Sequence, residues 1–171
     1  MWRTATSEND FNSYSSTGRI KCSGDIMSIV NLSNSNYDYF TGYLFKAMDN
    51  LTRAPELKPM TSITRCYSNM FDHCTSLIKP PSVVYVNSCD AGCNGMFYNC
   101  KKMTYTPELP STNLSNACYQ WMFGACSSLT KASELPATTL AAYCYTDMFY
   151  NCSSLTQAPA LPATTLARNC Y

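Results

Sequence analysis

The sequence predicts an α/β repeat array whose coils stack on one another and bury a shared core. The first observation is an internal repeat, in which residues 144–169 and the segment directly before them, 118–143, agree at 17 of 26 positions. Self-similarity at a fixed period is typical of repeat architectures, in which one coil cannot bury its own apolar side chains. The second observation is an unbroken register, because methionine and cysteine recur at the same period, at Met70, Met96, Met122 and Met148 and at Cys74, Cys100, Cys126 and Cys152.

This register divides the chain into two parts. Residues 1–39 do not show the repeat and are predicted to form an N-terminal cap, in which Trp2 and Phe11 pack over the first coil. Residues 40–171 form the array, with about five copies of the repeat. The chain stops at Cys170 and Tyr171, which match the first two residues of a new copy. Because a natural array ends in a polar cap, we expect this one to be truncated at its C-terminus.

Each coil is predicted to contain one short strand and one helical turn. Residues 129–132 and their equivalents are extended and are followed by proline in most copies. Proline cannot donate to a strand ladder, so only this short stretch can pair. Stacked strands of this kind would form a parallel sheet along one side, about 4.8 Å apart. In the remainder of the coil, Cys144, Met148 and Cys152 follow at steps of four, which favours a helical turn.

Most of the eleven cysteines recur with the repeat. In a small secreted protein such a number suggests a disulfide scaffold. A cysteine that returns once per coil, however, behaves as a small apolar residue filling the same core position, and cysteine is among the most buried residue types. We therefore predict mainly reduced, buried thiols, with a few disulfides as the alternative.

The composition narrows the classes of partner. Charged residues make up only 13% of the chain and the net charge is +1, which gives no reason to expect nucleic-acid binding, where a basic face is usual. No apolar run is long enough to span a membrane. The first residues lack the basic and apolar regions of a signal peptide, so we expect either a piece of a longer secreted protein or a protein exported in another way.

The unit CYxxMFxxCxSLTxAPxLPATTLAxx resembles the leucine-rich repeats of the BspA-like bacterial surface proteins. The matching residues are the pair Met122 and Phe123, then Cys126, then Ser128 with Leu129, then Leu135 with Pro136, and the same set recurs in the next copy. The resemblance covers about residues 40–171. It implies a right-handed leucine-rich-repeat solenoid on a bacterial cell surface that adheres to host or matrix proteins. Similar arrays also occur in phage tail and fibre proteins.

Two groups of variable positions are candidate binding residues. The first lies two places after the repeat leucine and would form a polar, partly basic stripe along the sheet, comprising Arg53, Lys79, Tyr105, Lys131 and Gln157. A second rank three places further on comprises Glu56, Ser82, Glu108, Glu134 and Ala160. The plainer interpretation is that the basic and acidic ranks are solvated charges that balance each other, which contributes only about 0–1 kcal/mol per pair.

The other candidate surface is the variable part of the CYxxMFxxC segment, which comprises the aromatic residues Tyr98, Trp121 and Tyr150 and the polar residues Gln120, Asp147 and Asn151. Aromatic rings among small polar residues are typical of adaptable recognition surfaces, although some of these rings could simply cover the neighbouring coil. We predict no catalytic, cofactor or metal residues. His73 and Cys74 are adjacent in sequence, and adjacent residues seldom face each other as base and nucleophile. The segment CDAGC at residues 89–93 lacks a second cysteine pair at zinc spacing.

The resulting hypothesis is a non-enzymatic binding or adhesion module of a bacterial cell-surface or secreted protein. Its partner would be a protein of the host, the matrix or another bacterial surface, or a glycan. The alternatives are a virion component, such as a phage tail-fibre segment that recognises a bacterial surface, and a passive spacer. The oligomeric state does not follow from the sequence.

Overall fold

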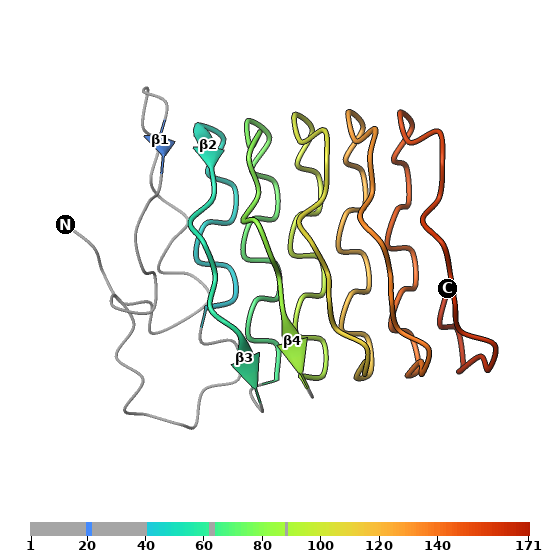
Figure 1. Cartoon of the computed structure of the whole chain (residues 1–171). Coiled ribbons are helices and arrows are strands. Elements are labelled where there is room, and N and C mark those ends of the chain that lie inside the picture. Colours follow the sequence, from blue (N-terminus) through green and yellow to red (C-terminus); the bar gives the residue numbers. More distant parts are fainter. Residues whose placement is uncertain (1–19, 22–40, 62–63, 88) are drawn as a thin grey trace.

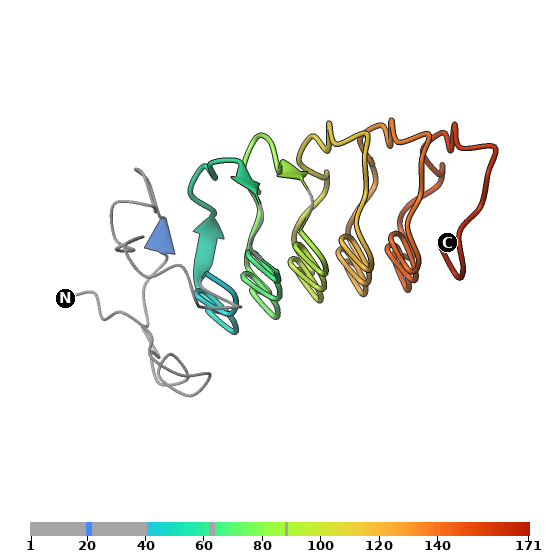
Figure 2. The same cartoon turned by 90° about the horizontal axis from the view of Figure 1, so that it is seen from below.

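The computed structural model describes residues 20–21, 41–61, 64–87 and 89–171. Successive copies of the repeat lie side by side along one axis, from the N-terminal to the C-terminal end (Figure 1). Each coil has a side made of tight turns and a side made of extended chain, and Figure 2 shows the turn segments aligned along one edge. Nearly all of the predicted cap, including Trp2 and Phe11, lies outside the described residues.

The turn side is built from two interleaved sets of backbone hydrogen bonds. Within a coil, every second N–H donates to the carbonyl three positions earlier, as Met70 does to Tyr67 at 3.2 Å. The residues between them donate to the equivalent turn of the next coil, as Phe71 does to the carbonyl of Met96 at 2.9 Å. The first set closes consecutive turns, and the second set joins each coil to the next. Half of these N–H groups therefore hold the coils together.

This geometry replaces the predicted helical turns, because the described residues contain no helix. Every fourth residue has a positive φ, for example Ala117 at 52°, Trp121 at 56° and Ala125 at 59°. A left-handed residue cannot continue an α-helix. The step of four between Cys144, Met148 and Cys152 is thus the period of consecutive turns. Like a helix, this series of turns directs every fourth side chain into the core.

The predicted continuous sheet is also absent from the described residues. The strands are β1 (Ile20–Lys21), β2 (Leu51–Arg53), β3 (Met60–Thr61) and β4 (Val86–Asn87). They form two parallel two-stranded sheets, β1 with β2 and β3 with β4. At residues 129–132 only an isolated bridge remains, between Tyr105 and Lys131. Proline at the fourth position after the repeat leucine in most copies removes a donor and ends the pairing.

The prediction of an α/β leucine-rich-repeat solenoid, with helical turns on one side and a stacked sheet on the other, is therefore wrong. Most backbone hydrogen bonds between neighbouring coils are made by the turn segments. On the extended side, neighbouring coils are joined by isolated bridges such as Arg53 to Lys79 and Thr139 to Thr165. Both kinds of link join residues 25 or 26 positions apart. The repeat length in the sequence is the contour length of one coil.

The core consists of columns of identical side chains, one from each coil. The clearest is a stack of phenylalanine rings in which neighbouring centroids lie 5.3–5.6 Å apart and the planes are within 12° of parallel, formed by Phe45, Phe71, Phe97, Phe123 and Phe149. Met70, Met96 and Met122 are fully buried beside it. Burying each such side chain contributes roughly 1.5–3 kcal/mol. Since each inner ring contacts rings from the coils on both sides, this stabilisation exists only when coils are stacked.

Cysteines form further columns of the core, and the ten that the structure describes are buried and form no disulfide. The thiols of Cys74, Cys100, Cys126 and Cys152 each donate to a carbonyl of the preceding coil, at 2.9–3.2 Å, always that of a stacked phenylalanine. The prediction of buried, reduced thiols is thus confirmed for the described residues. Cysteine recurs in each copy because this core position accommodates a small side chain that can also donate a weak hydrogen bond to the phenylalanine carbonyl.

Candidate functional site

The five stripe residues are all exposed and follow one another across the coils on the extended side, at Arg53, Lys79, Tyr105, Lys131 and Gln157. Parallel bridges tie Arg53 to Lys79 and Tyr105 to Lys131 directly. The repeat leucine two positions earlier is fully buried in the examples Leu51, Leu77 and Leu129. In a regular strand, residues two positions apart lie on the same face, so the outward position of the stripe residues shows that the extended side departs from strand alternation here. The structure brings this candidate set together.

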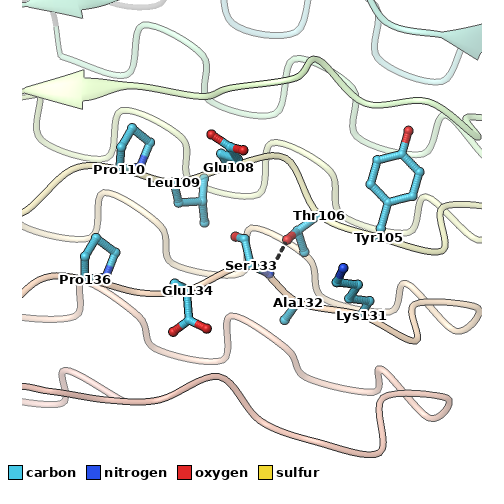
Figure 3. A pocket seen from close by; sticks show the side chains of 10 residues that line it. All are labelled: Tyr105, Thr106, Glu108, Leu109, Pro110, Lys131, Ala132, Ser133, Glu134 and Pro136. Atoms are coloured by element: carbon cyan, nitrogen blue, oxygen red, sulfur yellow. Dashed lines mark hydrogen bonds between the residues drawn. The ribbon is translucent and has the colours of Figure 1, made fainter.

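A hollow of about 680 Å³ lies beside the centre of the stripe. It is lined by two successive coils, with Tyr105, Thr106, Glu108, Leu109 and Pro110 from one and Lys131, Ala132, Ser133, Glu134 and Pro136 from the next (Figure 3). Its volume falls within the roughly 300–1,000 Å³ of small-molecule binding pockets. Tyr105 and Lys131 lie at one end and the two prolines at the other (Figure 3).

The floor of the hollow is fixed by a hydrogen bond between its two coils. The backbone N–H of Ser133 donates to Thr106 Oγ1 at 2.8 Å, as the dashed line in Figure 3 shows. Ser133 stands where other copies have proline, so this coil alone has an N–H to donate there. Leu109 and Leu135 are buried beneath. The polar side chains above them, including Lys131, Glu108 and Glu134, are exposed to solvent.

The expected balance between the basic and acidic ranks is not formed. In the described part of the chain no ion pair joins Arg53 to Glu56 or Lys131 to Glu134. The Glu56 carboxylate instead accepts hydrogen bonds from the backbone N–H and the hydroxyl of Ser82, at 2.8 and 2.6 Å. Side chains at equivalent positions of adjacent coils lie closer than side chains three positions apart on an extended segment, so contacts form along the array.

The second candidate surface lies on the turn side and is a continuous row of rings. Tyr98 and Trp121 meet edge to face with centroids 6.1 Å apart, and Trp121 meets Tyr150 at 5.1 Å. Tyr98 and Trp121 are half-buried, and Tyr150 is 48% exposed. Here we call these three residues the aromatic row. The structure brings together the three aromatic residues that the sequence suggested.

The arrangement of the row depends on a residue that sequence reasoning missed. Gly124 occupies the repeat position of Tyr98 and Tyr150, so the column lacks one ring. Trp121, from the preceding turn of the same coil, lies between the two tyrosines in its place. A Cβ on Gly124 would lie 2.8 Å from Tyr98 Cδ2 and 3.2 Å from Trp121 Cε3. The signal was present in the sequence as a glycine in the fourth copy, between the tyrosines of the third and fifth copies.

His73 extends the row by one coil, since its ring centroid lies 5.8 Å from that of Tyr98. Its Nδ1 contacts Asp72 Oδ1 at 2.5 Å, and Asp72 also pairs with Lys46 at 3.1 Å. The neighbouring Cys74 thiol points into the core and donates to the Phe45 carbonyl. The adjacent histidine and cysteine thus have separate partners on opposite sides of the chain.

The buried thiols are held in their protonated form. Burial raises the pKa of Cys118 to about 12, with a further increase from the neighbouring Cys144. Burial likewise raises the pKa of Cys152 to about 11. A protonated thiol is a poor nucleophile and a poor metal ligand. Within the described ranges, no three histidine, cysteine or acidic side chains gather as a metal site would require.

In the described residues, no helix has the length and apolar character needed to cross a membrane. Comparison with known proteins leaves the chain without an assigned relative. No protein-family model matches it, and neither a curated protein nor a solved structure is significantly similar.

Proposed function

We propose that this chain is a non-enzymatic binding or adhesion module of a bacterial surface protein, which recognises a protein or glycan through the stripe Arg53–Lys79–Tyr105–Lys131–Gln157. The observation that carries the proposal is the hollow beside Tyr105 and Lys131. Its base is rigid, because it is tied into the stacked coils, and its upper groups are exposed. A fixed base with a few polar groups at its rim is the usual form of a recognition site.

The energetics favour recognition over a purely structural role for these residues. Lys131, Glu108 and Glu134 are exposed, and in the described part of the chain no ion pair joins the lysine to its nearest acidic neighbour in the rank. They can therefore bind a ligand without first breaking a contact of the fold. Tyr105 is 41% exposed and offers a large, rigid contact surface at a low cost in conformational entropy. The bacterial-surface setting rests on the resemblance of the repeat unit.

The test is a binding screen of the purified protein against glycan and extracellular-matrix arrays. The variant Lys79→Ala/Tyr105→Ala/Lys131→Ala removes the centre of the stripe. A matched control, Tyr85→Ala/Lys101→Ala/Lys102→Ala, removes the same residue types from exposed positions outside it. We expect a ligand whose binding is lost in the first variant and kept in the second.

Two results would contradict this proposal. Equal binding by both variants would place recognition elsewhere on the molecule. No binding partner for the unmodified protein would favour the passive-spacer alternative.

A further inference from the structure

The aromatic row is a second surface with its own chemistry, separate from the stripe. The stripe lies on the extended side of the coils, whereas Tyr98, Trp121 and Tyr150 belong to the turn segments. Figure 2 shows these two kinds of segment on different sides of the array. A ligand bound along the row would therefore lie on a different side of the array from one bound at the stripe.

The three rings carry no charge, and their neighbours are amides together with one exposed carboxylate, Asp147, at the repeat position of Trp121. A carboxylate accepts hydrogen bonds from neutral hydroxyls and repels an anionic ligand. Asn99 and Gln120 are half-buried beside it and Asn151 is exposed. Asn94 Nδ2 donates to Gln120 Oε1 at 3.0 Å, a contact that does not use the Gln120 amide nitrogen. Aromatic faces and amides together suit a ligand with polarised C–H bonds and neutral hydroxyls. The faces carry the negative part of the ring quadrupole, which attracts such C–H bonds.

The spacing of the rings is set by the coils. Adjacent phenylalanine rings of the core beneath lie 5.6 Å apart at Phe97–Phe123 and at Phe123–Phe149. Each coil from the third to the fifth contributes one ring to the row, and His73 adds a ring from the second coil. One pyranose unit of an extended polysaccharide has a length similar to this coil spacing. A linear chain laid along the array would therefore meet one ring per sugar.

We propose that the aromatic row binds a linear, uncharged polysaccharide, one sugar unit per coil. The sugar rings stack on Tyr98, Trp121 and Tyr150, and their hydroxyls bond to the flanking amides. Trp121 is the central contact, because it touches both tyrosines. A proline-rich peptide could also stack on such rings. Its polyproline II helix, however, repeats every three residues, or about 9 Å, which does not match the 6.1 and 5.1 Å between the ring centroids of the row.

The experiment titrates the protein with cello-, xylo- and manno-oligosaccharides from the disaccharide to the hexasaccharide, and measures binding by calorimetry and Trp fluorescence. The background carries Trp2→Phe, so that Trp121 is the one remaining indole. We expect binding to at least one neutral series, with an affinity that rises up to the tetrasaccharide and then levels off. Sodium polygalacturonate and heparin, which are charged, should bind less well.

Variants assign the site. Tyr150→Ala and Trp121→Ala should each weaken binding about tenfold, as truncation of a central aromatic contact does. Tyr85→Ala, an exposed tyrosine outside the row, should leave it unchanged. Circular dichroism checks that each variant is folded, and Tyr150 serves as the decisive position because its ring is 48% exposed. The stripe variant should keep this binding, so the two proposals can fail independently.

The inference is overturned if no neutral oligosaccharide binds. It is also overturned if binding survives Tyr150→Ala in a folded protein, or if a proline-rich peptide binds the row and the sugars do not.

Discussion

Gly124 lies directly against the ring of Tyr98, so close that a Cβ on it would come within 2.8 Å of Tyr98 Cδ2. The glycine stands at the repeat position of a tyrosine, and Trp121 of the same coil covers the space that it leaves. One missing side chain thus reorganises a surface that spans three coils.

Gly124→Ala should displace the rings of Tyr98 and Trp121 and lower the free energy of unfolding by about 1–3 kcal/mol, the usual cost of overpacking. Chemical denaturation followed by Trp fluorescence measures the change. The double variant Gly124→Ala/Tyr98→Ala removes the clashing ring and should show a clear coupling between the two sites. Strictly additive losses would mean that the glycine is not there to accommodate Tyr98.

Phe97→Ala should cost more stability than Phe149→Ala. Phe97 is fully buried between the rings of Phe71 and Phe123, so its removal leaves a cavity that costs about 3–5 kcal/mol. Phe149 is only partly buried and stacks on Phe123. Urea unfolding of the two variants gives both losses. Similar values would show that the rings do not stabilise the coils through two-sided stacking.

Ala125→Gly should stabilise the protein or leave it unchanged. Ala125 has a φ of 59°, a conformation that costs about 1–2 kcal/mol for an L-residue and little for glycine. The control is Ala132→Gly, in the extended segment and without a positive φ, which should lose about 0.5–1 kcal/mol. Thermal unfolding compares them. A loss at Ala125 as large as that at Ala132 would contradict the role of the left-handed turn positions.

Stability should fall as the pH rises above about 9. In the unfolded chain the thiols lose their protons near their ordinary pKa of 9.0, whereas burial holds the pKa of Cys118 at about 12 and that of Cys152 at about 11 in the folded protein. Between these values the folded state binds more protons, so the free energy of unfolding decreases with pH.

Urea titrations at pH 7, 9 and 10.5 test this dependence. The variant Cys118→Ala/Cys152→Ala provides the control, because its stability should depend less on pH over the same range. An equally steep decline in that variant would assign the effect to other groups, such as the buried Tyr145, whose pKa burial also raises.

Much of the candidate site could be seen in the sequence because the repeat aligns equivalent positions. The stripe and the aromatic row were both found as variable positions in an otherwise constant unit, and the structure places the members of each set next to one another. The contact of Glu56 with Ser82 was missed. The spacing of the charges predicts pairing within a coil, whereas the polar partner of Glu56 lies one coil further on.

By itself, the sequence determined the length of one coil and the columns of Met, Phe, Leu and Cys that fill the core. The period of the repeat and its apolar positions are properties of the linear chain. Only the tertiary structure decided where the backbone hydrogen bonds go. A step of four positions fits a helix and a series of turns equally well, because both turn the same side chains inward. The turns are selected by the neighbouring coil, whose carbonyls accept every second N–H and compensate for the left-handed residues.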